Sequence, residues 1–226
     1  MNRMLRDALL DAWAVLAPIT CAGCGVADRG LCAVCRAELV AAPVLGRLPD
    51  GTPVFSALRY ASAAQGAILA LKEQGRTDIV RALAECLAGA ADAARRELGF
   101  VPVDVAIVPT SRRAWRRRGY DPVALLARRA GLRPLRHALR PLGSHEEQKR
   151  LDRQARGRNL VGTMLAPRPM VGRRVLLVDD VLTTGATLSE AARAIRAAGG
   201  EVACAVTLAF TPKNFPTQSG HTGENE

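Results

Sequence analysis

Two adjacent acids and a threonine-rich turn make up the segment with the clearest chemical meaning. Residues 175–188 read VLLVDDVLTTGATL, in which an apolar run leads to Asp179 and Asp180. The two carboxylates can accept hydrogen bonds from sugar hydroxyls. The following turn would offer backbone N–H groups and hydroxyls to an anion at the N-terminus of a helix. Its members are Thr183, Thr184, Gly185, Ala186 and Thr187. A ribose 5-phosphate fits this pair of subsites, and the alternative is a plain strand–turn–helix with a threonine cap.

Four cysteines within fifteen residues form a second cluster with chemical potential. Residues 21–35 read CAGCGVADRGLCAVC, which places Cys21 and Cys24 in one Cys-x-x-Cys pair and Cys32 and Cys35 in another. Two such pairs can converge on one tetrahedral ion, and four thiolates suit Zn²⁺. A disulfide pairing and an iron–sulfur cluster are the alternatives, and a reducing compartment disfavours the first of them. We expect a closed structural zinc site. Cys86 and Cys204 lie in apolar surroundings and are expected to be buried.

The positive charge of the chain is confined to one segment. The net charge is +11, and residues 112–158 contain fifteen Lys and Arg against four acids, while the remainder is balanced. Such a surplus indicates an anionic ligand, either a small polyphosphate or a nucleic-acid backbone, with a solvated arginine-rich surface as the alternative. Only eight residues are aromatic, which disfavours a stacking platform for single-stranded nucleic acid.

Alternating strand and helix patterns must position these groups. Strands are expected over 52–61, 103–109, 135–139, 174–180 and 201–210, and helices over 63–71, 77–98, 121–130 and 187–198. This alternation predicts an α/β protein with a parallel sheet covered on both faces. The carboxyl ends of such strands hold ligands, so the acidic pair should stand at the rim of a crevice.

Patterns of charge and hydrophobicity also predict the structure of the chain ends and the cellular compartment. An amphipathic helix explains the first twenty residues better than a signal peptide, because Asp7 and Asp11 interrupt the apolar run. No apolar run approaches the ~18 residues of a membrane span, and we expect a cytoplasmic protein. We divide the chain into an N-terminal helix and zinc knuckle (1–45), the α/β domain (46–211) and a disordered tail (212–226).

These motifs resemble a known family. The segment VLLVDDVLTTGAT is similar to the ribose-phosphate signature of type I phosphoribosyltransferases. The whole of residues 10–211 resembles the ComF family, which consists of amidophosphoribosyltransferase-like proteins linked to DNA uptake in competent bacteria. The resemblance also includes the cysteine knuckle, the LK..G stretch from Leu71 to Gly75, the VP…RRRG segment 108–119, and a Q..L....R..N pattern formed by Gln148, Leu151, Arg156 and Asn159.

The resemblance implies a phosphoribosyltransferase-like sheet that binds phosphoribosyl diphosphate (PRPP) with Mg²⁺. It implies that Arg112, Arg118 and Gly119 lie in the loop that touches diphosphate, and that Arg156 reaches the diphosphate from a mobile loop over 143–159. Lys72, Gln148 and Asn159 are further expected substrate contacts. Asp179, Asp180 and Arg156 would carry the chemistry.

Two departures from the family pattern occur near the diphosphate loop. Tyr120, Asp121 and Pro122 stand where the family has an aromatic residue followed by Asn-Gln, so an amide contact is expected to be lost. Thr110 and Ser111 follow Val108-Pro109 in place of a second apolar step.

Three functions of different classes are consistent with the sequence. The first is a phosphoribosyl transferase with an unidentified acceptor, and the second is a non-catalytic sensor of PRPP or a nucleotide. The third is a zinc-knuckle component of DNA uptake that binds single-stranded DNA or a helicase through residues 112–158. The intact pocket motif favours the first two, and self-association into a homo-oligomer is left open.

Overall fold

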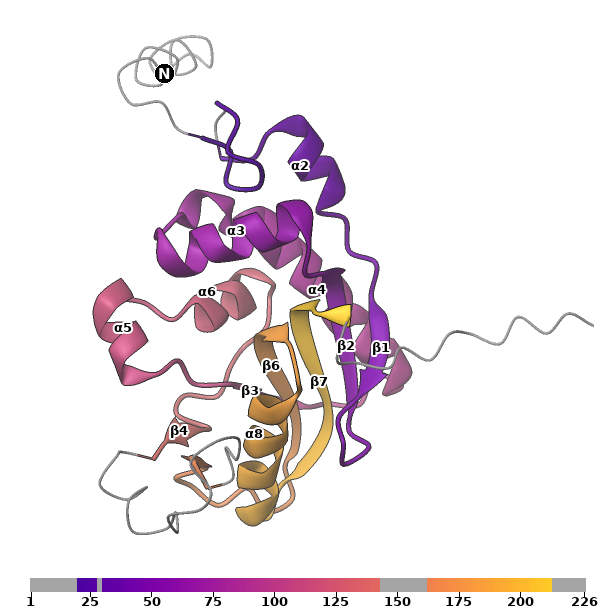
Figure 1. Cartoon of the computed structure of the whole chain (residues 1–226). Helices are drawn as coiled ribbons and strands as arrows, with labels where there is room; N and C mark the ends of the chain where they lie inside the picture. The colour runs from indigo at the N-terminus through magenta and orange to yellow at the C-terminus, as the bar shows by residue number, and fades with distance from the viewer. Residues whose placement is uncertain (1–19, 28–29, 143–161, 213–226) are drawn as a thin grey trace, which may run out of the picture.

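The computed structural model describes residues 20–27, 30–142 and 162–212 (Figure 1). The expected N-terminal helix, the 143–159 loop and the tail after residue 212 lie outside these ranges. None of the described helices is long and apolar enough to cross a membrane.

Short strands and helices alternate along the chain as the sequence pattern predicts. The helices are α2 (Ala33–Glu38), α3 (Ser62–Glu73), the 3₁₀ turn η1 (Thr77–Ile79), α4 (Val80–Glu97), α5 (Arg112–Arg118), α6 (Pro122–Arg129) and α8 (Ala186–Ala197). The strands are β1 (Val44–Arg47), β2 (Pro53–Arg59), β3 (Asp104–Ile107), β4 (Arg140–Pro141), β5 (Met164–Leu165), β6 (Arg174–Leu182) and β7 (Glu201–Phe210).

The main sheet has five strands in the order β1-β2-β7-β6-β3. Strands β2, β7, β6 and β3 run parallel, with Ala106 beside Leu177 and Val178 beside Val206, whereas the edge strand β1 is antiparallel to β2. The parallel arrangement brings the carboxyl ends of β3, β6 and β7 to one edge, which faces α3, α5 and α6 in Figure 1. A separate two-stranded sheet pairs β4 with β5.

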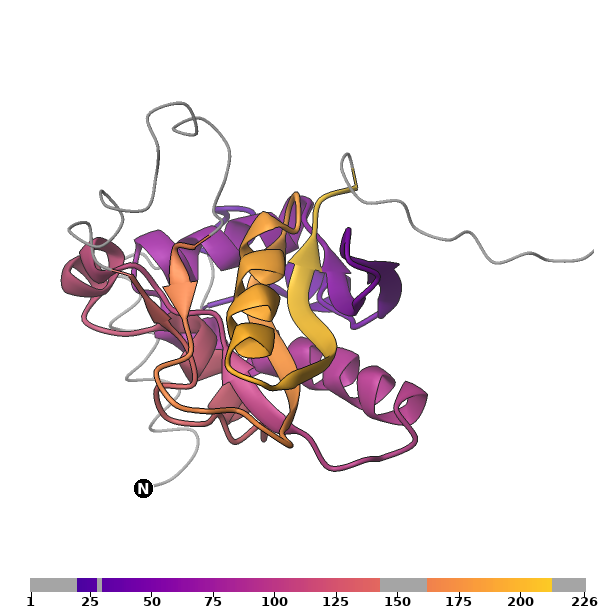
Figure 2. The ribbon, with the colours of Figure 1, turned by 90° about the horizontal axis from the view of Figure 1, so that it is seen from below.

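Helices cover both faces of the sheet, as expected. Figure 2 shows α8 on one side of the sheet and α4 on the other. Alternate residues of β6 serve the two faces, since Leu176 and Val178 belong to the hydrophobic cluster that includes α4 and α6, while Val175 and Leu177 belong to the cluster that includes α8. The acidic residues that follow in β6 are therefore carried by a strand that is buried on both sides.

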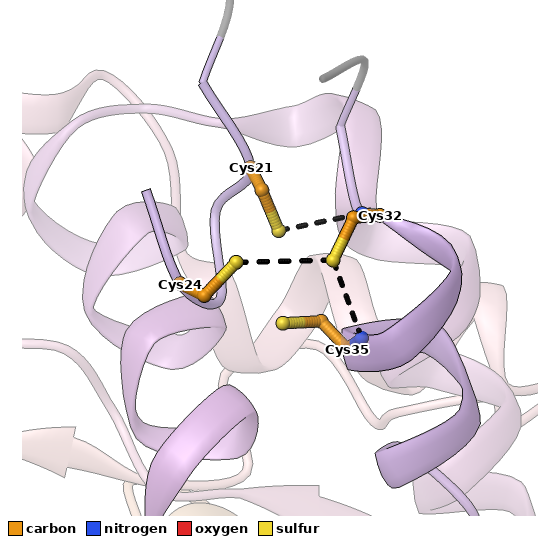
Figure 3. A group of neighbouring side chains, drawn as sticks. All are labelled: Cys21, Cys24, Cys32 and Cys35. Atoms are coloured by element: carbon orange, nitrogen blue, oxygen red, sulfur yellow. Dashed lines mark hydrogen bonds between the residues drawn. The ribbon is translucent and has the colours of Figure 1, made fainter. Parts of the chain in front are cut away.

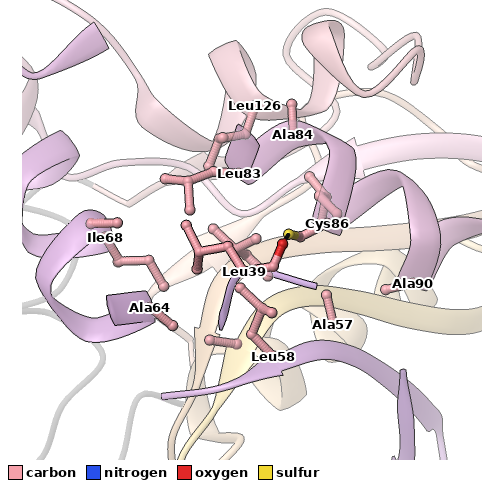
Figure 4. Packing of buried hydrophobic residues seen from close by; sticks show 14 of the residues in the cluster. Leu39, Ala57, Leu58, Ala64, Ile68, Leu83, Ala84, Cys86, Ala90 and Leu126 are labelled. Carbon is pink, nitrogen blue, oxygen red and sulfur yellow. Dashed lines mark hydrogen bonds between the residues drawn. The ribbon is translucent and has the colours of Figure 1, made fainter. Parts of the chain in front are cut away.

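The core on the α4 face also includes the cysteine-rich N-terminal segment. Leu39, at the end of α2, is buried among residues of β2, α3 and α4, including Leu58, Ile68 and Leu83 (Figure 4). The Cys86 thiol donates a hydrogen bond to the Leu39 carbonyl at 3.2 Å. Cys86 and Cys204 are both fully buried, which confirms that prediction, and burial raises the pKa of each thiol.

One expected strand is wrong. Residues 135–139 do not form a strand, and the chain beside β3 is limited to a single bridge between Pro134 and Val105. Proline has no N–H to donate, and His137 has a positive φ of 55°, which turns the backbone away from the sheet. Conversely, the short elements α2, β1 and α5 were not expected.

Candidate functional site

The acidic pair lies in the second half of β6, an internal strand between β7 and β3. Asp179 is beside Thr207 of β7. The backbone N–H of Asp180 donates to Oδ1 of Asp179 at 2.8 Å. Both residues are half-buried and lie in the part of β6 near its carboxyl end.

The surroundings of the pair disfavour two negative charges. Burial raises the pKa of Asp179 to about 8, and the charge of Asp180 adds to this effect, as does Asp121 more weakly. The N–H of Asp180 and the ammonium of Lys72 act in the opposite direction. Near neutral pH the pair therefore shares one negative charge more readily than two.

Lys72 is brought to the pair from a distant part of the chain. It lies in the last turn of α3, and its Nζ is 3.0 Å from Oδ2 and 3.2 Å from Oδ1 of Asp180. The two side chains are 31% and 14% exposed. The expected substrate contact Lys72 is thus placed directly at the acidic pair.

The turn after β6 forms a cradle at the start of α8. Gly185 is the N-cap residue with a φ of +78°, a left-handed conformation that favours glycine, and Thr184 Oγ1 accepts from the N–H of Ala186 at 3.4 Å. Thr183 and Thr184 are exposed, whereas Ala186 and Thr187 are half-buried. A Cβ on Gly185 would lie 3.0 Å from Leu48 Cδ2, so the β1–β2 hairpin lines the back of this turn. The N-terminal end of α8 and its positive dipole end meet this turn, an arrangement that suits an anion.

The segment after β3 is partly helical. Ser111 caps α5 by accepting from the N–H of Ala114 at 3.2 Å, and Gly119 ends the helix with a φ of +76°. Arg113, Arg116 and Arg117 are exposed. The expected diphosphate loop is therefore a short helix with an arginine-rich outer surface.

Arg118 is turned the other way. Its side chain is only 9% exposed and donates from Nη1 to the backbone carbonyl of Lys72 at 3.0 Å. Its Nε is buried without a hydrogen-bond partner among the described residues. In this structure Arg118 holds the end of α3 beside the acidic pair.

The departure at residues 120–122 has a structural reason. The hydroxyl of Tyr120 donates to the carbonyl of Leu71, Asp121 caps α6 by accepting from the N–H of Ala124 at 3.1 Å, and Pro122 occupies the first turn of that helix. These three residues fix α3 and α6 in place, a role that an isolated pattern comparison does not reveal.

Three expected contacts lie outside the described residues, namely Gln148, Arg156 and Asn159. The nearest described element on the carboxyl side of this segment is β5. Glu190, which is 3% exposed, accepts from the N–H of Met164 at 2.9 Å, and Arg193 donates to the Met164 carbonyl at 2.9 Å. Arg193 also binds both carboxylate oxygens of Glu190, so α8 fixes β5 through its backbone.

The four cysteines of the N-terminal segment converge as the spacing predicts. Their sulfur atoms all lie within 4.8 Å of one another (Figure 3). The Sγ atoms of Cys24 and Cys32 are 3.8 Å apart, which is too far for a disulfide of ~2.05 Å. A tetrahedral zinc site with Zn–S bonds of ~2.3 Å requires a sulfur–sulfur separation of about 3.8 Å. The cluster could therefore hold a zinc ion.

Backbone N–H groups prepare this cluster for negative charge. Sγ of Cys21 accepts from the N–H of Gly23 at 3.4 Å and from that of Cys32 at 3.3 Å. Burial opposes ionisation of Cys21, but these and neighbouring N–H groups outweigh it and lower the pKa to about 6. Burial and the other sulfurs raise the pKa of Cys35. A bound cation would offset the crowding by neighbouring sulfurs that opposes negative charge on Cys35.

The cysteine knuckle, meaning residues 20–35, rests directly on α3. A Cβ on Gly66 would lie 2.3 Å from the Gly23 carbonyl oxygen and 2.8 Å from that of Ala22. Arg76, just beyond α3, donates to the carbonyl of Thr20 at 2.9 Å. The same helix therefore contacts the cysteine knuckle along its side and the acidic pair at its end.

Comparison with known proteins agrees with this geometry. The phosphoribosyl transferase domain family matches residues 144–217. DNA utilization protein YhgH of Salmonella typhi is 30% identical over 195 residues, which cover 73% of this chain and 83% of that protein. The same protein of Escherichia coli O6:H1 is 28% identical over 194 residues, covering 81% and 85%. Orotate phosphoribosyltransferase of Pyrobaculum aerophilum is 50% identical over 52 residues, which are 23% of this chain and 24% of the enzyme.

The mixed sheet flanked by helices, together with the family match, defines a protein with a phosphoribosyltransferase domain. With its N-terminal four-cysteine cluster, the chain belongs to the ComF-like family that includes DNA utilization protein YhgH.

Proposed function

We propose that this protein binds PRPP together with Mg²⁺ and transfers the phosphoribosyl group to a nucleophile that remains to be identified. The observation that supports this most strongly is the β6–α8 unit, in which four residues separate Asp180 from Gly185, the N-cap of α8. The turn 183–187 would hold the 5-phosphate, and Asp179 and Asp180 would accept from the ribose hydroxyls.

The arginine-rich surroundings support a diphosphate beside this ribose. Cleavage at the anomeric carbon builds negative charge on the leaving diphosphate, and guanidinium groups stabilise such charge through paired hydrogen bonds. Exposed arginines of α5 are available at the carboxyl end of β3, and we propose Arg112 from that helix and Arg156 from the 143–159 segment as further contacts. Mg²⁺ bound with the diphosphate would neutralise part of that charge.

The cysteine knuckle has a different role in this proposal. We propose that it binds one structural zinc ion, because four thiolates close the coordination shell and leave no position for a reacting water. Its thiols need a reducing compartment to remain free, which supports a cytoplasmic location.

The test is a calorimetric titration with PRPP and Mg²⁺. Replacing both acids by Asn keeps their size and removes the negative charge of the pair, which makes it a strong acceptor. The affinity should fall by about 1.5–3 kcal/mol for each charge-assisted hydrogen bond lost. The variant Glu85→Gln/Asp92→Asn removes the same charge from an exposed face of α4 and serves as the control. Equal affinity of the Asp179→Asn/Asp180→Asn variant and the parent would show that the ribose does not bind here. A pyrophosphate-release assay over candidate acceptors then separates a transferase from a sensor.

A second candidate function is binding of single-stranded DNA, and one observation favours it. Trp115 is 54% exposed in the middle of α5, between the exposed residues Arg113, Arg116 and Arg117. An indole among guanidinium groups can stack on a base while the arginines neutralise phosphates. Each neutralised phosphate contributes a slope of about −0.7 in log K against log salt.

The experiment for this candidate uses the anisotropy of a labelled oligonucleotide at several salt concentrations. Glutamate at positions 113, 116 and 117 should flatten the salt slope, whereas Trp115→Ala should weaken binding with the slope unchanged. Arg118 is left intact, because it is buried and holds α3. Indifference of the oligonucleotide affinity to all of these changes would exclude α5 as the interface.

A further inference from the structure

Lys72 is the cation that contacts the acidic pair within the described part of the chain. Its ammonium contacts both oxygens of the Asp180 carboxylate, with Nζ 3.0 Å from Oδ2 and 3.2 Å from Oδ1. A divalent cation bound to this carboxylate would occupy the same region. The side chain of Asp180 is only 14% exposed, so the ammonium contacts a carboxylate with little access to solvent.

The position of Lys72 is fixed from several sides. Arg118 binds its backbone carbonyl, Tyr120 binds the carbonyl of Leu71, and Arg117 forms an ion pair with Glu73. The cysteine knuckle packs against Gly66 on the side of the same helix. A lysine has a long, flexible side chain, and anchoring its backbone in this way keeps the ammonium within reach of Asp180.

The charges around the pair are already balanced by these residues. Asp180 is compensated by Lys72, and its neighbour Asp179 tends to keep its proton for the reasons given above. A pair compensated by an ammonium has little need of a metal ion, whereas the same pair without it would attract one.

We propose that Lys72 is a positioning residue that takes the place of a divalent cation at Asp180. The inference rests on the proposed function, since it concerns how the same acidic pair receives a ribose. It assigns the metal requirement to the diphosphate alone. A ligand with the ribose and the 5-phosphate but without the diphosphate is then bound with no metal ion.

Ribose 5-phosphate is the probe that tests this division. The parent protein should bind it with the same affinity in buffers with and without Mg²⁺, both free of chelator so that the cysteine knuckle keeps its zinc. Lys72→Met should bind it about tenfold more weakly without Mg²⁺, the effect of losing one charged partner, and should recover when Mg²⁺ is added. Lys72→Arg keeps the charge and should stay within a few-fold of the parent. Arg81→Met, which breaks an exposed ion pair on α4, is the control.

A measurement without any sugar separates this inference from the proposed function. Lys72→Met should gain a weak Mn²⁺ site detectable by electron paramagnetic resonance, and adding Asp180→Asn should remove it. If the parent needs Mg²⁺ to bind ribose 5-phosphate, or if Lys72→Met gains no Mn²⁺ site, Lys72 does not replace a cation although the ribose site stands. If the parent binds no ribose 5-phosphate under either condition, the proposed function fails and the inference falls with it.

Discussion

Gly66 on α3 offers the sharpest test of how the cysteine knuckle is attached. In Gly66→Ala the new Cβ would lie 2.3 Å from the Gly23 carbonyl oxygen, whereas ordinary contacts begin at 3.4 Å, so the backbone of the knuckle must retreat by about 1 Å. Two backbone oxygens meet the methyl group, and neither can rotate away. Overpacking of this kind costs ~1–3 kcal/mol, and alanine gains ~1 kcal/mol over glycine in a helix. Because two backbone oxygens clash, we take the overpacking cost as ~3 kcal/mol, and the net decrease in the free energy of unfolding is about 2 kcal/mol.

The assay combines thermal unfolding with zinc release to a chromophoric chelator. A loss of about 2 kcal/mol lowers the Tm of a chain of this size by roughly 4–8 °C. The retreat should also speed the release of zinc. Gly89→Ala on α4 is the matched control, because its Cβ would meet a single methyl group, that of Ala41, at 2.8 Å. It should leave zinc release unchanged. If Gly66→Ala raises the Tm, as helix propensity alone predicts, the cysteine knuckle does not pack on α3.

Three further predictions concern the phosphate cradle, the acidic pair and the metal. Gly185→Val should abolish PRPP binding, because Gly185 has a φ of +78° and a Cβ at this position would meet Leu48. Gly172→Val is the control, since Gly172 also has a positive φ, +72°, but has open space around it. This variant should strain the fold and leave the PRPP affinity measured by titration unchanged. Burial and Asp180 raise the pKa of Asp179 from 3.8 to about 8, so its stabilising effect is complete below pH 3.8 and is lost as pH rises through 8. The free energy of unfolding by urea should therefore fall over this range, and fall less in Asp179→Asn. Metal analysis should return one zinc per chain, and its removal should expose residues 20–39 to proteolysis, whereas iron or less than about half an equivalent of zinc would contradict the assignment.

The parts of the site that could be predicted from the sequence are those contained in one continuous segment. The order of apolar strand, acids, threonine-rich turn and helix defines β6 and α8 without any other part of the chain. The two Cys-x-x-Cys pairs define the metal cluster in the same way. In both cases neighbours in sequence are neighbours in space.

Contacts between distant segments could not be predicted from composition or spacing. The Lys72–Asp180 pair joins residues 108 positions apart, and only the packing of α3 over the edge of the sheet brings them together. The inward turn of Arg118 depends on the length of α5, whose neighbouring arginines have the same residue type and point outward. Residues 135–139 looked like a strand because apolar content alone does not reveal that Pro134 precedes them and that His137 has a left-handed backbone.

The clamp between α8 and β5 has a consequence for how sequences of this family can change. Glu190 accepts from the backbone N–H of Met164, and Arg193 donates to its carbonyl. These hydrogen bonds involve only the backbone of residue 164 and do not depend on its side chain. Removing Arg193 would leave the buried carboxylate of Glu190 without its charged partner, whereas replacing both residues by apolar ones leaves no unpaired charge. Homologues should therefore lose or retain Glu190 and Arg193 together, while position 164 varies among apolar residues independently of them. Sequence changes at position 164 would then be tolerated without moving α8.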